Sequence, residues 1–164
     1  MMNQLFALLD RLLEATMPHL VAAPILLPML TAALMLMLGE QRRRLKAILS
    51  VVSGLGGLLV ALALLRWVNA PDTGTGPGSI GVYLPGNWPA PFGIVLGADR
   101  LSSMMVALTG VVAFAVSLYS TSRWDRAGVH FHPLLQLQLM GLNGAFLTGD
   151  LFNLFVFVEV MLSV

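Results

Sequence analysis

The sequence predicts an all-α integral membrane protein, built as a polytopic bundle of helices. Of its 164 residues, 57% are hydrophobic and only 10% are charged, whereas soluble domains average roughly 45–50% and 25%. The mean hydropathy is +0.85. A soluble fold of this size needs more polar side chains to cover its surface. The composition therefore assigns the chain to the membrane proteins.

Composition also excludes several other classes. The chain has no cysteine, which rules out disulfides, thiolate metal sites and a cysteine nucleophile. A net charge of +1 argues against a nucleic-acid partner, which requires a basic surface. The glycines of "TGTGPG" (73–78) do not match a phosphate-binding loop, so we interpret them as a turn. We expect no cofactor and no metal, and the N-terminus lacks the basic start and apolar stretch of a cleavable signal peptide.

The elements follow in chain order within one membrane domain, residues 1–164. Over residues 1–18, leucines recur at helical spacing between charged residues, which predicts an amphipathic helix lying in the membrane interface. Apolar runs close to the ~20 residues of a membrane-spanning helix come next, and the last is too short and looks cut off. The predicted spans are 20–38, 47–65, 101–119, 133–149 and the start of a fifth, 151–164.

Residues 66–100 form the long loop between the second and third spans. The loop is rich in glycine and proline, and apolar residues alternate at Ile80, Val82 and Leu84 and again at Ile94 and Leu96. Alternation bounded by turn formers predicts a small β-hairpin. Asp99, at the end of this loop, is placed to cap the helix of the third span.

Basic residues set the predicted orientation, because they accumulate in cytoplasmic loops. The turn after the first span, "GEQRRRLK" (39–46), and the turn after the third, "STSRWDRAGVHFH" (120–132), lie on one side and hold most of the basic residues. That side should be the cytoplasm. The N-terminus and the long loop are then outside.

The fourth span is the most polar, with Gln136, Gln138 and Asn143. Two interpretations stay open: hydrogen bonds between helices, or the lining of a hydrated proton path. His130 and His132 precede it, and two histidines without a third ligand make a polar helix start a better interpretation than a metal site; a proton-collecting role stays open. In the first span, Pro24 and Pro28 are tolerated where a neighbouring helix satisfies the freed carbonyl.

Glu159 is the one residue among seventeen charged residues that lies inside an apolar run. Asp150 marks the boundary of this span, and nine residues further on, at 1.5 Å per residue, Glu159 lies roughly 13 Å deep, near the middle of the membrane. Placing an acid there costs on the order of 2.5–3.5 kcal/mol. A proton pathway needs an acid whose protonation responds to its neighbours, and Glu159 is a candidate for this role. The alternative is that Glu159 is a neutral glutamic acid with a structural role.

Three stretches resemble a known family. "FHPLLQLQLMGLNGAFLTGDLFNLFVFVEVMLSV" (131–164), "GNWPAPFGIVLGADRLSSMM" (86–105) and "HLVAAPILLPMLTAAL" (19–34) are similar to the D subunit of multisubunit (Mrp-type) Na⁺/H⁺ antiporters. This family is related to the antiporter-like membrane subunits of respiratory complex I. The resemblance implies a bacterial inner-membrane transporter subunit, not an enzyme, that works with other subunits. It also implies that Glu159 transfers protons. From their residue types and positions, Gln136, Gln138, Asn143, His130, His132 and Asp150 are the candidates for the proton path.

The family's later helices supply lysines that pair with this glutamate, and the only lysine here is Lys46, expected in a turn. The chain therefore resembles about the N-terminal third of such a subunit. The first hypothesis is part of an antiporter subunit that moves protons inward as sodium leaves. The alternatives are an antiporter-like subunit of complex I or of a membrane hydrogenase, and a structural fragment that does not transport.

Overall fold

The computed structural model describes residues 19–39, 42–69, 81–85, 93–123, 128 and 130–164. Most of these residues are helical, as the sequence predicts. The amphipathic helix predicted over residues 1–18 lies outside the described residues, as does most of the long loop. The described elements are the helices α2 (Ala23–Met37), α3 (Arg43–Val68), α4 (Arg100–Arg123), α5 (Phe131–Leu147) and α6 (Leu151–Ser163), with two short strands, β1 (Gly81–Tyr83) and β2 (Leu96–Ala98).

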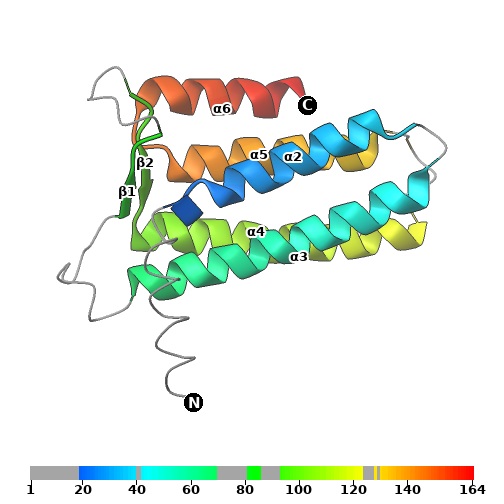
Figure 1. Ribbon diagram of the computed structural model, residues 1–164, viewed down its shortest axis with the longest axis horizontal. Helices are drawn as coiled ribbons and strands as arrows, with labels where there is room; N and C mark the ends of the chain where they lie inside the picture. Colours follow the sequence, from blue (N-terminus) through cyan, green and yellow to red (C-terminus); the bar gives the residue numbers. More distant parts are fainter. Residues whose placement is uncertain (1–18, 40–41, 70–80, 86–92, 124–127, 129) are drawn as a thin grey trace, which may run out of the picture.

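Four of the helices pack around a common centre, and the fifth is added outside them (Figure 1). Helix α3 packs against α4, and α2 packs against α5; contacts between α2 and α3 and between α4 and α5 close the ring. Helix α6 packs against α5, on the side away from α3 and α4 in Figure 1. The strands cover one end of this bundle, here called the sheet end.

The lengths of the helices correct part of the sequence prediction. By length and composition, two described helices can cross a membrane, namely α3 and the Arg100–Thr121 part of α4, while α2 and α6 are shorter apolar helices. Five transmembrane helices are therefore not confirmed. Polar residues lower the hydropathy of α5, and α6 has only 13 residues.

The start of α3 also differs from the prediction. The sequence places Arg43, Arg44 and Lys46 in a turn, but α3 begins at Arg43. Lys46 therefore belongs to the first turns of a helix and is buried, with 3% of its surface exposed. The apolar run that starts at Ala47 conceals this earlier start, because arginine and lysine are also good helix formers.

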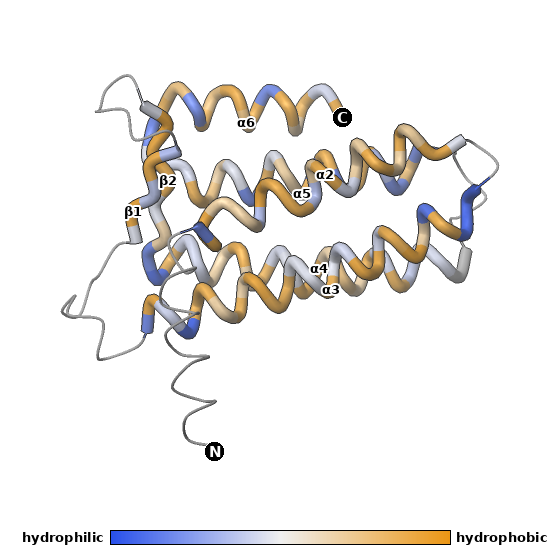
Figure 2. Tube along the Cα trace, viewed as in Figure 1, coloured by the Kyte–Doolittle hydropathy of each residue, from blue (hydrophilic) through white to orange (hydrophobic). Residues whose placement is uncertain are grey.

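Small and polar residues lie inside the bundle and large apolar residues lie outside, as expected for a protein in lipid. Figure 2 shows that hydrophobic residues predominate along the helices. Large apolar side chains are exposed on every helix, while many buried positions hold alanine or serine, including Ala32, Ala61, Ser50 and Ser117. Because lipid tails are as apolar as leucine, helices in membranes associate through small residues and polar contacts. This distribution supports the membrane assignment.

Small residues bring α3 and α4 together at two levels. A Cβ added at Gly54 would lie 3.5 Å from the Cα of Phe114, and one added at Gly110 would lie 3.0 Å from the Cα of Leu58. The sequence predicts close packing for Gly54, Gly57 and Ala61. The structure confirms it for Gly54 and for Ala61, which is fully buried. Gly57 is different, because a Cβ there would meet no atom within 4 Å.

The predicted hairpin is present at the sheet end. Strands β1 and β2 pair antiparallel, with Val82 opposite Gly97. The sheet is tied to the junction of α5 and α6, because the Gly149 N–H donates to the Val95 carbonyl at 2.8 Å and Leu96 forms a bridge with Thr148. The short strands therefore hold the start of α6 in place.

Asp99 caps α4, as the sequence predicts. Its Oδ1 accepts a hydrogen bond from the Ser102 N–H at 2.6 Å, and the Ser102 Oγ accepts one from the Asp99 N–H at 2.8 Å. These reciprocal bonds satisfy two backbone donors, as in a capping box. The hydrogen bonds from the backbone and side chain of Ser102 lower the pKa of Asp99 from its usual 3.8.

We expect Asp99→Ala to lower the free energy of unfolding by about 1 kcal/mol, while Asp99→Asn, which keeps a capping oxygen, loses much less. Because the pKa is lower in the folded state, ionised Asp99 stabilises the fold above its unfolded pKa. This contribution is lost as pH falls through the folded pKa. Thermal unfolding in detergent between neutral pH and pH values below 3.8 checks both points. An equally steep acid destabilisation in Asp99→Ala would contradict the pH assignment.

Candidate functional site

Helix α6 carries the mid-span acid, and its start is fixed by Asp150. The Oδ1 of Asp150 accepts the Phe152 N–H at 3.2 Å, and its Oδ2 lies 3.4 Å from the Nδ2 of Asn153, which donates to it. A carboxylate at this position satisfies one of the free N–H groups of the first turn. Asp150 therefore marks the start of the helix, as expected from the sequence.

Two glycines of α5 let α6 approach closely. A Cβ added at Gly144 would overlap the ring of Phe157, and one added at Gly141 would lie 2.7 Å from the Cγ of Met161 and 3.1 Å from the Phe157 carbonyl oxygen. Glycine is therefore needed at both positions for this packing. The face of α6 that contains Phe157 and Met161 is the face that contacts α5.

Glu159 lies on the other face of α6. It is two residues from both Phe157 and Met161, a rotation of roughly 200° at 3.6 residues per turn, and it is exposed. Within the described part of the chain its carboxylate has no hydrogen bond or ion pair; the one bond at this residue is from the Ser163 Oγ to the backbone carbonyl of Glu159, at 2.8 Å. The carboxylate stands on an apolar surface that includes Phe155, Val158 and Leu162.

Three polar residues of α5 point into the four-helix bundle instead. His132, Gln136 and Asn143 are spaced by four and seven residues, which places them on one face of a helix. All three are buried. Gly141 and Gly144, which contact α6, lie on a different face of α5. The structure therefore brings Gln136 and Asn143 into the bundle but does not place either beside Glu159.

Gln136 connects α5 with α3. Its Oε1 accepts a hydrogen bond from the Ser53 Oγ at 3.0 Å, and its Nε2 donates to the Ser50 Oγ at 3.2 Å. The Ser50 Oγ lies 3.4 Å from the Ser117 Oγ of α4, and the Thr31 Oγ1 of α2 lies 3.1 Å from the Ser53 Oγ. One buried amide thus joins all four helices, and the prediction of hydrogen bonds between helices is confirmed at this residue.

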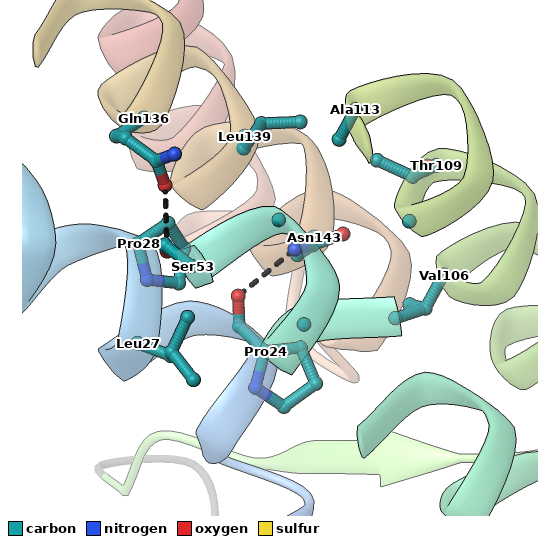
Figure 3. A pocket seen from close by; sticks show the side chains of 13 residues that line it. Pro24, Leu27, Pro28, Ser53, Val106, Thr109, Ala113, Gln136, Leu139 and Asn143 are labelled. Atoms are coloured by element: carbon teal, nitrogen blue, oxygen red, sulfur yellow. Dashed lines mark hydrogen bonds between the residues drawn. The ribbon is translucent and has the colours of Figure 1, made fainter. Parts of the chain in front are cut away.

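Asn143 compensates for a proline in α2. Pro28 has no N–H, so the Pro24 carbonyl lacks the donor that a helix normally supplies four residues later. The Nδ2 of Asn143 donates to this carbonyl at 2.9 Å (Figure 3). A neighbouring helix therefore satisfies the carbonyl that the proline leaves free, as the sequence predicts for this span.

The other candidate residues for the proton path lie apart from Gln136 and Asn143. Gln138 is half-buried and is rotated by about 200° from Gln136. His130 is exposed at the start of α5. The rings of His132 and Phe131 meet edge to face, with centroids 5.4 Å apart. Among the described residues, no group of three metal-ligating side chains lies together.

The serines of the spans were missed by the sequence analysis. Ser50 and Ser53 lie three residues apart in α3, as do Ser117 and Ser120 in α4, and all four are buried. A pair of serines at this spacing occupies one helix face. The spacing is therefore a signal in the sequence from which their contact with the polar fourth span could have been predicted.

Comparisons with known proteins identify relatives of the chain. No protein-family model matches it. It is 54% identical over 145 residues to the D subunit of a probable K⁺/H⁺ antiporter of Rhizobium meliloti, covering 88% of this chain and 26% of the relative. It is 40% identical to the D subunit of a Na⁺/H⁺ antiporter of Alkalihalophilus pseudofirmus, covering 89% of this chain and 28% of the relative. The chain thus spans about a quarter of the length of these relatives.

Solved structures show a similar fold. The chain matches the Mrp complex of Dietzia sp. with a TM-score of 0.70 and 30% identity, over 92% of this chain and 26% of the solved one. It matches the membrane-bound sulfane sulfur reductase, an archaeal respiratory membrane complex, with a TM-score of 0.69 and 27% identity, over 86% of this chain and 28% of the other. Both solved structures are membrane complexes.

Proposed function

Because the chain is homologous to the D subunits of Mrp-type antiporters, we propose that it forms part of a subunit that exchanges protons for a monovalent cation. Within this part of the subunit, Glu159 acts as the proton carrier. The observation that carries the proposal is the exposed carboxylate of Glu159 on an apolar face of α6. An acid held in a membrane-spanning helix is costly, and such acids typically serve ion or proton transfer.

The described contacts also suit this role. Helix α6 is held against α5 through Phe157 and Met161, while Glu159 on the other face has no side-chain bond within the described residues. A carboxylate whose position is fixed by the packing of its helix, and whose oxygens are free to bond, can exchange a proton with a group brought to that face. The neutral structural alternative requires a hydrogen-bond partner for Glu159, which the described residues do not provide.

We propose Asp150 and Gln138 as the more direct candidates for the proton path to Glu159. Asp150 lies on the same helix, and Gln138 lies on α5 away from the face that Gln136 and Asn143 occupy. A path through the buried His132, Gln136 or Asn143 must pass from the interior of the bundle to the other side of α5. The exposed His130 is a candidate for the point where such a path begins.

The orientation follows from the positions of the basic residues. Helix α3 begins at Arg43 and the antiparallel α4 ends at Arg123, so these two basic helix ends lie at the end of the bundle opposite the sheet. We place this end in the cytoplasm of a bacterium, by the positive-inside rule, and the sheet end and the N-terminus outside. The other subunits of a hetero-oligomeric antiporter are the proposed partners.

The transported cation is proposed as Na⁺, from the resemblance in sequence. K⁺ is the second candidate, because the relative that is 54% identical is named as part of a probable K⁺/H⁺ antiporter. The similarity to a respiratory membrane complex supports a different alternative, an antiporter-like subunit that redox partners drive. The subunits that copurify with the complete protein distinguish an antiporter from a redox complex.

The proposal is tested in everted membrane vesicles that contain the complete complex, from a strain without other antiporters. Respiration acidifies the vesicles, a pH-sensitive dye reports the gradient, and Na⁺ or K⁺ is then added. We expect one of these cations to dissipate the pH gradient, and vesicles without the complex to show no change. A gradient that neither cation alters would contradict the antiporter assignment.

A further inference from the structure

The centre of the four-helix bundle contains a small cavity between α2, α3, α4 and α5 (Figure 3). Its walls are mainly apolar, from residues such as Leu27, Val106 and Leu139. Four polar side chains also reach it: Ser53, Thr109, Gln136 and Asn143. The centre of a water-sized sphere can move within about 20 Å³, so the cavity has room for a water molecule.

Asn143 leaves an acceptor without a partner at this cavity. Its amide orientation is defined, because the Pro24 carbonyl can only accept and therefore requires the Nδ2 of Asn143 to face it. The Oδ1 consequently points away from Pro24, toward the side of Thr109 and Ala113 in Figure 3. Asn143 is 9% exposed, and its Oδ1 is buried without a hydrogen-bond partner among the described groups. Such an atom is costly unless something donates to it.

The other polar groups at the cavity also present acceptors. The Thr109 hydroxyl uses its proton on the Met105 carbonyl, at 2.9 Å, and the Ser53 hydroxyl uses its proton on the Gln136 Oε1, at 3.0 Å. The Thr109 oxygen therefore remains able to accept hydrogen bonds, whereas the Ser53 oxygen already has the Thr31 hydroxyl 3.1 Å away. The ligand of this cavity must therefore donate hydrogen bonds or be a cation.

Charge decides between these two classes. Among the described residues, the cavity is lined by neutral side chains only, and burying a cation without a counter-charge in a membrane protein is strongly unfavourable. A water molecule is neutral, fits the volume and has two protons to donate. We propose that one ordered water occupies this cavity, donating to the Oδ1 of Asn143 and to the hydroxyl oxygen of Thr109.

This water joins Thr109 of α4 to the pair of Asn143 and Pro24, which have no direct bond to Thr109 among the described residues. With the water in place, hydrogen bonds connect α2, α5 and α4 at the level where Pro28 interrupts α2. The inference is independent of the role proposed for Glu159.

The test is a cryo-electron microscopy map of the complete complex at a resolution that shows bound waters. We expect one density peak within hydrogen-bond distance of the Asn143 Oδ1, without the many close oxygen ligands of a cation. An empty cavity, a protein donor on this oxygen or a peak with cation coordination would overturn the proposal.

Thr109→Val supplies a second measurement that does not remove Asn143. This substitution keeps the shape of the side chain but removes the hydroxyl, while Thr109→Ser keeps the hydroxyl. With a bound water, we expect Thr109→Val to weaken or abolish the density and to lower the melting temperature of the complex, and Thr109→Ser to keep the density. Around a dry cavity the valine leaves the melting temperature unchanged or raises it, and that result would overturn the proposal.

Discussion

In the complete complex, Glu159→Gln abolishes cation-driven proton movement while the complex still assembles. Glutamine has nearly the same size and can form hydrogen bonds, but it cannot take up and release a proton. We expect the dye signal in everted vesicles to fall to that of vesicles without the complex. Glu159→Asp keeps a titratable group on a shorter side chain, and we expect it to retain part of the activity.

Ser163→Ala is the matched control for this experiment. Ser163 lies one turn further along α6, is exposed, and its hydroxyl bonds only the backbone carbonyl of Glu159 within the described residues. We expect this variant to transport normally and to assemble in the same amount. If Glu159→Gln also transports normally, Glu159 is not the proton carrier. If Glu159→Gln fails to assemble, the neutral structural interpretation is favoured instead.

Asn143→Leu destabilises the chain, and Pro28→Ala relieves part of that loss. Leucine cannot donate to the Pro24 carbonyl, which then stays buried and unpaired, at a cost of about 1–3 kcal/mol. Alanine at position 28 supplies the missing backbone N–H and restores the helical bond to Pro24. We therefore expect the double variant to unfold at a higher temperature than Asn143→Leu alone.

The double-mutant cycle separates the contribution of the hydrogen bond from Asn143 to the Pro24 carbonyl from the general cost of replacing a buried amide. Thermal unfolding of the wild type, both single variants and the double variant gives the coupling between the two positions. Gln138→Leu is the matched control, because Gln138 is an amide of the same helix that makes no hydrogen bond within the described residues; we expect it to change the unfolding temperature little. If Asn143→Leu lowers the unfolding temperature equally with proline and with alanine at position 28, the assigned role of the Asn143–Pro24 hydrogen bond is contradicted.

The secondary structure was largely predictable because it depends on local patterns. Apolar runs mark the helices, alternation around Val82 and Leu96 marks the strands, and Asp99 and Asp150 mark two helix starts. The predicted start of α3 was wrong because Arg43, Arg44 and Lys46 are compatible with both a turn and a helix. Burial of Lys46 depends on its neighbours in space, which no local pattern shows.

The candidate site was predictable only as a set of residues. A glutamate in an apolar run is visible in one dimension, and so are the amides of the fourth span. Their relative positions depend on which face of α5 meets α6, and this is decided by Gly141 and Gly144 fitting against Phe157 and Met161. The close fit of these glycines turns Gln136 and Asn143 toward the bundle, away from Glu159.

Composition and periodicity alone therefore establish a membrane protein of apolar helices with one acid deep in its last apolar run. These properties follow from residue types and their spacing along one chain. The tertiary structure decides which polar groups meet: Asn143 bonds the Pro24 carbonyl, Gln136 bonds two serines of α3, and Glu159 lies apart from both amides. The reason is geometric, because a hydrogen bond requires two groups within about 3 Å, and only the packing of the helices brings residues distant in sequence that close.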